Sequence, residues 1–227
     1  MSTVGSYRGP NIVTRGLVLH LDAASPNSYY APNGGTVWKD VSGNGNNGTL
    51  VNGTTFADDA FVFDGANDLI DCGNDSSLSM EGSSFTMINV AKPIGGSSRQ
   101  LMSKGTWSQS GNYQYRIDGN GYLTWWLYGH TPQTTSYAQA VTAGEWIFTA
   151  MTYVPNTLAT LYLNGQEVKS TAITGTLGSV SGNFQIGAKL GVEVFNGDIA
   201  IAYLYNRALT AQEVLQNFNA TKDRFGL

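Results

Sequence analysis

The stretch between residues 107 and 137 is the part of the sequence best suited to hold a ligand. Its rings are Trp107, Tyr113, Tyr115, Tyr122, Trp125, Trp126, Tyr128, His130 and Tyr137. Sugars stack on exposed aromatic faces, and neighbouring amide and guanidinium groups bond their hydroxyls, so the stretch could form a glycan platform. The same rings could instead fill a core or bury a subunit contact, where Tyr and Trp are also enriched.

Alternation along residues 122–128 separates these two readings, because successive side chains of a strand point to opposite faces. Leu123, Trp125 and Leu127 share one face, which we predict to be core. The other face is polar and aromatic, and we expect it to be the concave, accessible side, with residues of the preceding strand as companions. The predicted carbohydrate-binding residues are Trp126, Tyr128, Tyr122, Arg116, Gln114 and His130.

Acidic residues are placed poorly for catalysis. A retaining glycosidase needs two carboxyl groups about 5–5.5 Å apart. The Glu residues are far apart in sequence, and Asp68 and Asp71 flank a predicted strand at an odd spacing that puts them on opposite faces. His20 and His130 lie in different motifs and form no recognisable relay or metal pair. The sequence therefore predicts a protein that is not an enzyme.

Composition excludes several partners and compartments. The net charge is -4 and the 12 basic residues are scattered, which argues against nucleic acid. No apolar run approaches the ~18 residues of a membrane span, and residues 1–16 lack the basic start and apolar segment of a secretory signal. The single cysteine, Cys72, cannot form an internal disulfide and is expected to be an apolar filler.

Short apolar runs bounded by turn formers must position these residues. Charged residues make up only 12% of the chain, against about 25% in ordinary domains, and Gly is abundant, which favours strands over helices. Asn-Gly pairs at 118–121 and 163–166 predict hairpins, and residues 25–48 read as a long loop. The predicted strands span 16–22, 60–63, 69–72, 84–91, 101–103, 113–118, 122–128, 146–153, 158–163, 167–172, 184–187 and 197–205.

The end of the chain breaks the strand pattern. Thr210 and Glu213 have the spacing of a capping box, and Val214, Leu215 and Phe218 then share one helical face. The sequence thus predicts an all-β antiparallel sandwich with one short C-terminal helix over about 210–221 that packs on it. At 227 residues, one domain is expected.

Five motifs, in order, carry a family resemblance. They are IVTRGLVLHLDA (12–23), WKDVSGNGNNGTL (38–50), FVFDGAND (61–68), LYLNG (161–165) and GDIAIAYLYNRALTAQEV (197–214). This order resembles laminin-G-like domains of the concanavalin A-like lectin/glucanase superfamily, and implies a jelly-roll sandwich. Because that superfamily hosts lectins, adhesion modules, lyases and hydrolases, function has to be argued from the site. Its hydrolases carry an E-x-D-x-x-E pattern that no Glu of this chain begins.

The resemblance also implies a structural calcium ion. Similar domains often hold calcium with acidic residues near the first and last strands, which match Asp22 and Asp198. Asp64 and Asn67 are weaker candidates. Calcium takes six to eight oxygen ligands, and Gly-rich turns bring backbone carbonyls together for it.

The two ends of the chain carry a narrower resemblance. The segments YRGPNIVT (7–14) and ATKDRFGL (220–227) look like versions of this domain in virion structural proteins of tailed bacteriophages. That implies a capsid decoration, fibre or tail component assembled in the host cytoplasm, which fits the missing secretory signal. Residues 1–11 would be an N-terminal arm that binds other virion proteins or copies of the same chain in an oligomer, and residues 12–227 the laminin-G-like domain. A carbohydrate-binding module or lectin outside a virion is the alternative, and a polysaccharide-cleaving enzyme comes last.

Overall fold

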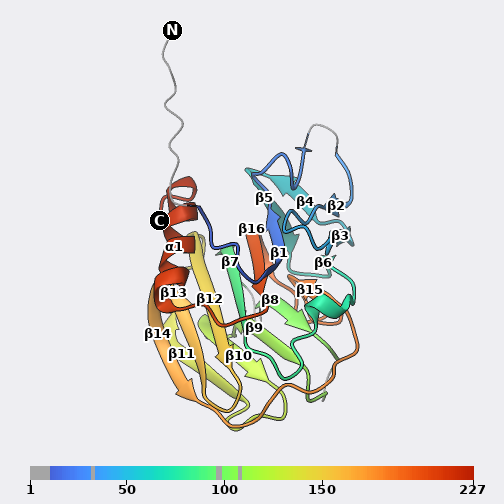
Figure 1. The fold of residues 1–227 in the computed structure, drawn as a ribbon. Helices are drawn as coiled ribbons and strands as arrows, with labels where there is room; N and C mark the ends of the chain where they lie inside the picture. Colours follow the sequence, from blue (N-terminus) through green and yellow to red (C-terminus); the bar gives the residue numbers. More distant parts are fainter. Residues whose placement is uncertain (1–10, 32–33, 96–98, 107–108) are drawn as a thin grey trace.

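Short strands joined by tight turns form two antiparallel sheets that pack face to face (Figure 1). The computed structural model describes residues 11–31, 34–95, 99–106 and 109–227. The predicted all-β sandwich with one C-terminal helix is confirmed. Within the described ranges, no helix is long and apolar enough to cross a membrane.

In sheet A, the last strand of the chain pairs with three other strands. The order of this sheet is β14 (Gln166–Ala172), β13 (Leu158–Leu163), β12 (Ile147–Val154), β7 (Phe85–Pro93), β16 (Asn196–Tyr205), β5 (Ala60–Asp64) and β4 (Thr55–Ala57), and β1 (Leu17–Asp22) also pairs with β16. Every pairing is antiparallel.

Sheet B carries the aromatic stretch. Its order is β11 (Thr134–Ala140), β10 (Tyr122–Leu127), β9 (Tyr113–Ile117), β8 (Arg99–Lys104), β15 (Phe184–Ile186), β6 (Leu69–Asp71), β3 (Gly48–Val51) and β2 (Val37–Trp38). Four of the strands were not predicted: β2 and β3, which lie in or at the end of the expected loop, and β4 and β11. They are short or polar and so lack the apolar runs by which the other strands are recognised.

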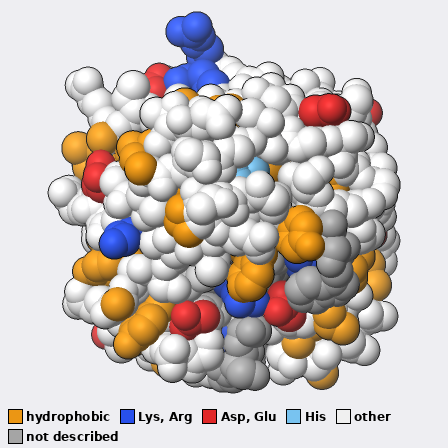
Figure 2. All heavy atoms as spheres, turned by 90° about the horizontal axis from the view of Figure 1, so that it is seen from below, with side chains coloured by type: hydrophobic (Ala, Val, Ile, Leu, Met, Phe, Trp, Pro, Cys, Tyr) orange, Lys and Arg blue, Asp and Glu red, His pale blue; other side chains and the backbone are white. Residues whose placement is uncertain are grey.

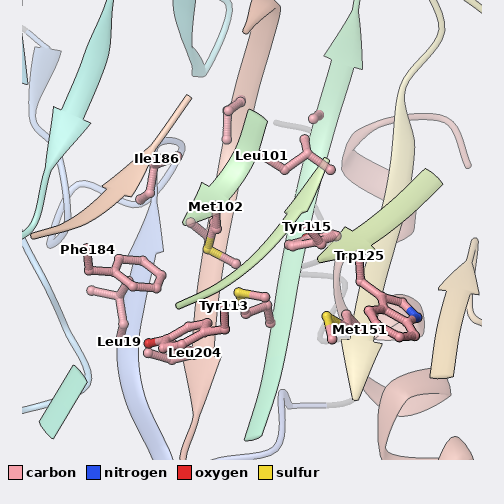
Figure 3. Close-up of a cluster of buried hydrophobic side chains, with 14 of the residues drawn as sticks. Leu19, Leu101, Met102, Tyr113, Tyr115, Trp125, Met151, Phe184, Ile186 and Leu204 are labelled. Atoms are coloured by element: carbon pink, nitrogen blue, oxygen red, sulfur yellow. The ribbon is translucent and has the colours of Figure 1, made fainter. Parts of the chain in front are cut away.

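The core fills the space between the sheets. Side chains from both layers meet there with no exposed surface, among them Leu19, Met151 and Leu204 from sheet A and Met102, Tyr113 and Trp125 from sheet B (Figure 3). The predicted core face of residues 122–128 is confirmed, because Leu123, Trp125 and Leu127 are fully buried.

One polar contact joins the two layers inside this core. The Tyr115 hydroxyl on β9 donates to Asn89 Oδ1 on β7 at 2.6 Å and lies 3.2 Å from Thr149 Oγ1 on β12. The amide of Asn89 in turn donates to the Ile201 carbonyl on β16 at 3.0 Å. All these side chains are buried, where a hydrogen bond left unmade is costly, so the contact fixes where β9 lies over sheet A.

Helix α1 (Ala211–Thr221) covers the outer face of sheet A, beside β12–β14 in Figure 1. The predicted capping box is present: the Thr210 side chain accepts from the Glu213 amide, and Glu213 accepts from the Thr210 amide. Val214 is buried, and the Phe218 ring meets Phe148 edge-on at 5.5 Å. The helix therefore seals a second apolar layer on sheet A.

Both predicted hairpins form, with different turns. Between β13 and β14, Asn164 and Gly165 both have positive φ, 48° and 77°. Between β9 and β10 only Gly121 does, at 80°, because the Asp118 carboxylate accepts from the amides of Asn120 and Tyr122 and so stabilises a longer turn.

The predicted arm, residues 1–11, lies outside the described residues except for Asn11. The Asn11 carbonyl accepts a hydrogen bond from Gln216 Nε2 of α1 at 2.7 Å. The surface seen in Figure 2 is mostly neither charged nor hydrophobic, in keeping with the low charged fraction of the chain.

Gly165→Ala is expected to destabilise the domain more than Gly144→Ala, although both glycines have φ near 80°. A Cβ at 165 would lie 2.7 Å from Phe218 Cδ1 and 3.1 Å from Leu215 Cδ1, whereas a Cβ at 144 meets nothing within 4 Å. Both variants pay about 1–2 kcal/mol for the left-handed backbone. Only Gly165→Ala adds ~1–3 kcal/mol of overpacking under α1.

Thermal melting of the two variants checks this, since ~1 kcal/mol corresponds to about 2–4 °C in a domain of this size. Equal shifts would show that α1 does not pack on this turn.

Candidate functional site

A pocket of about 330 Å³ lies on the face of sheet B that points away from the core. It is lined by Asn112, Gln114, Arg116, Trp126, Tyr128, Lys189 and Glu193. Four of these, Gln114, Arg116, Trp126 and Tyr128, belong to the predicted carbohydrate-binding set. No sequence pattern pointed to Asn112, Lys189 or Glu193.

Strand alternation places the floor and one wall of the pocket. Trp126 on β10 lies opposite Gln114 on β9, while Trp125 lies opposite Tyr115 and faces the core. Because Tyr115 and Trp125 are fully buried, their neighbours in sequence must point outward. Trp126 is half-buried and Gln114 is 1% exposed, so the floor is tight and polar beside an aromatic ring.

The opposite wall comes from the loop between β15 and β16, which folds back over sheet B. The Ser103 hydroxyl on β8 donates to the Ala188 carbonyl at 2.8 Å, and Gln185 Oε1 accepts from the Leu190 amide at 2.6 Å. Lys189 and Val192 exchange two backbone hydrogen bonds of 2.9 Å, closing a tight turn. These contacts hold Lys189 and Glu193 above the strands.

An ion pair crosses the pocket. Arg116 Nη1 donates to Glu193 Oε1 at 2.8 Å, and the Arg116 guanidinium lies 5.8 Å from the centre of the Trp126 ring. Lys189 is 1% exposed. Burial lowers the pKa of Lys189 to about 8, and the nearby carboxylate of Glu193 opposes that shift.

Three buried polar atoms of residues that line the pocket have no hydrogen-bond partner among the described residues. They are Asn112 Oδ1, Arg116 Nε and Glu193 Oε2. Each leaves a polar group out of water without compensation, an arrangement that native structures rarely keep unless something else bonds it. Ordered water or a bound polar ligand would supply the missing partners.

Two predicted residues lie away from the pocket. Tyr122 is half-buried at the start of β10 and is not part of the lining. His130 is only 2% exposed: its Nε2 lies 2.8 Å from the Tyr153 hydroxyl and its ring packs edge-on against that of Tyr153. The structure therefore does not bring His130 or Tyr122 together with the other four.

Residues 64–215 match the family model of the concanavalin A-like lectin/glucanases superfamily. The chain belongs to this superfamily. The match extends over all the pocket residues and most of both sheets. No sequence among curated proteins matches the chain.

Solved structures share the superfamily fold at low sequence identity. The binding domain of Paraclostridial Mosquitocidal Protein 1 has 17% identity and a TM-score of 0.67, covering 90% of this chain and 52% of that one. The Trypanosoma rangeli sialidase in complex with sialic acid has 17% identity and a TM-score of 0.66, covering 92% and 33%. A botulinum neurotoxin type C, described as depending on two ganglioside molecules to enter cells, has 13% identity and a TM-score of 0.66, covering 90% and 51%.

These likenesses show the fold alone. The chain spans about half the length of the toxin structures and a third of the sialidase.

The calcium site implied for such domains does not fit Asp22 and Asp198. Asp22 Oδ1 pairs with Arg224 at 3.1 Å, and Asp198 Oδ2 pairs with Lys92 at 2.6 Å. Strand register sets Asp22 opposite Ile201 rather than Asp198. Each carboxylate thus has its own cation.

Asp64 ends β5, and Asn67 lies in the bend that follows. Asp64 Oδ1 accepts from the Ala66 amide, and the Asn67 carbonyl accepts from Asn52. Among the residues that the structure describes, no group of three or more His, Cys, Asp or Glu side chains could hold a metal ion.

The two histidines of the chain predict a loss of stability in mild acid. Burial lowers the pKa of His130, and that of His20, below the ordinary 6.5. As the pH falls below about 6.5, the unfolded chain takes up protons that the folded chain does not, so stability is full above this pH and declines below it. Arg207 lowers the pKa of Glu213 to about 2, so protonation of this carboxylate reduces the stability only below about pH 4.5.

The melting temperature should therefore fall between pH 7 and pH 5. The double variant His20→Gln/His130→Phe removes both histidines of the chain and should flatten this dependence, whatever its own stability at pH 7. An unchanged slope in the double variant would assign the dependence to other groups.

Proposed function

We propose that this domain is a non-catalytic carbohydrate-binding domain and that its ligand occupies the pocket of sheet B. The observation that carries the proposal is the set of three unpartnered buried polar atoms beside the half-buried ring of Trp126. An aromatic ring with a few convergent polar groups is the usual composition of a small-ligand site.

The chemistry of the lining suits a sugar. A pyranose ring has an apolar face of C–H groups that stacks on an aromatic ring, and an edge of hydroxyls that bond polar groups. Trp126 and Tyr128 offer aromatic surface, and Asn112, Gln114 and Arg116 offer polar groups. A volume of about 330 Å³ is at the small end of the range for ligand pockets, so it suits one or two sugar units.

The carboxylates support binding rather than cleavage. Glycoside hydrolysis by the usual routes needs two carboxyl groups flanking the scissile bond. Of the described residues that line the pocket, Glu193 alone is acidic, and it is engaged by Arg116 at 2.8 Å. A polysaccharide-cleaving enzyme is therefore the less favoured alternative.

A virion role for this carbohydrate-binding domain is a finer proposal that rests on the terminal motifs. The expected arm falls almost wholly outside the described residues, so the role stays a prediction. Purified particles that contain the chain at a fixed copy number would support it. Particles without it would leave a free-standing lectin as the better account.

Trp126→Ala should weaken glycan binding at least tenfold, because stacking on an aromatic ring is lost along with its share of the pocket wall. The melting temperature should change by no more than a few degrees, since the ring is half-buried. Binding to an array of immobilised glycans and thermal melting measure the two effects.

Two aromatic neighbours on the same strand serve as controls. Tyr122→Ala removes a half-buried ring outside the pocket and should leave binding intact. Trp125→Ala removes a fully buried side chain and leaves a cavity in the core, which should cost about 3–5 kcal/mol of stability. Undiminished glycan binding by the Trp126 variant would refute the proposed site.

A further inference from the structure

The unpartnered atoms of the pocket differ in what they need from a ligand. Asn112 Oδ1 and Glu193 Oε2 are acceptors and require donors, while Arg116 Nε is a donor and requires an acceptor. The Asn112 amide nitrogen is already used, since it donates to the Thr106 carbonyl at 2.7 Å. Two of the three vacancies therefore call for a ligand that donates hydrogen bonds.

Hydroxyl groups meet both requirements, because each is one donor and also an acceptor. Two hydroxyls could donate to Asn112 and Glu193, and one of them could accept from Arg116. An ionised carboxylate, sulfate or phosphate only accepts. Such a group could bond Arg116 Nε, but it has no proton to donate to Asn112 Oδ1 or Glu193 Oε2.

The charges of the pocket do not overrule this requirement. Lys189 and Arg116 are cations and Glu193 is an anion, so the net charge alone would attract an acid. Arg116 is paired with Glu193 Oε1 at 2.8 Å, so the remaining positive charge belongs to Lys189, whose pKa burial lowers to about 8. The second Glu193 oxygen is buried and unpaired, and an anion placed against it would face repulsion with little water to screen it.

From this we infer that the pocket binds a neutral, hydroxyl-bearing sugar unit in preference to its carboxylated or sulfated counterparts. Glu193 is the specificity-determining residue: its free oxygen accepts from a sugar hydroxyl and repels anions. Arg116 holds Glu193 in place. The inference rests on the proposed function, and it goes against a sialic acid ligand, which carries a carboxylate.

Matched sugar pairs test the inference. The probes are methyl hexopyranosides and the corresponding methyl uronides, which differ only in a hydroxymethyl group against a carboxylate at C6. For each pair that binds, calorimetry or ligand-detected NMR should give an affinity at least tenfold higher for the neutral member. The affinity for the neutral sugar should be the same at low and high salt, because this sugar carries no charge that salt could screen.

The variant Glu193→Gln tests whether the Glu193 carboxylate sets the preference for neutral sugars. It should weaken binding of the neutral sugar about tenfold or more, since a hydrogen bond to a charged acceptor is lost, and should narrow the preference over the uronide. Glu145→Gln changes the net charge equally at an exposed position outside the pocket and should alter neither affinity. Thermal melting verifies that both variants fold.

The preference for neutral sugars and carbohydrate binding itself fail through different results. Tighter binding of the uronides by the wild-type protein would overturn the inference and leave carbohydrate binding standing. A Glu193→Gln variant that binds the neutral sugar as tightly as the wild type would also overturn it. Failure of every neutral and acidic sugar to bind would refute the proposed function itself.

Discussion

The hydrogen bonds of the Tyr115 hydroxyl in the core are the constraint on which the pocket depends. They tie β9 to β7 and β12 of the opposite sheet at buried positions. With Tyr115 held inward, Gln114 and Arg116 must point outward, and pairing with β10 sets Trp126 opposite Gln114. A one-residue slip of β9 would send these polar groups into the core, so the contact that orders the fold also orders the site.

Strand alternation positions Gln114, Arg116 and Trp126, whereas the turn at residues 188–193 positions Lys189 and Glu193. Leu190 and Glu193 have φ of 52° and 51°, values that side-chain-bearing residues rarely adopt. Such a conformation costs on the order of 1–3 kcal/mol and persists only where neighbours hold it. Here Gln185 and Ser103 bond the turn from sheet B. These contacts hold the strained turn, and with it Lys189 and Glu193, over the strands.

The residues that strand alternation positions could be predicted from the sequence, whereas those that long-range contacts position could not. Repeating apolar patterns are local, so the sequence located most strands, the core face of residues 122–128 and the capped helix. Gln114, Arg116, Trp126 and Tyr128 could be found because period-two alternation fixes which face they share. Glu193 could not be, because it reaches Arg116 across 77 positions of the sequence through a strained turn that no local pattern encodes. Likewise His130 follows the strand and has turned inward to Tyr153, and Asp22 meets Arg224 only once the C-terminal segment is folded.

The central claim is that a sugar binds against Trp126, and indole NMR tests it directly. The chain has five Trp residues, so a spectrum of their N–H groups should contain five signals, of which Trp126→Phe identifies one. Titration with the tightest-binding neutral sugar should shift the Trp126 signal and leave those of the buried Trp38 and Trp125 in place. Saturation of binding with the Trp126 signal unmoved would contradict the account.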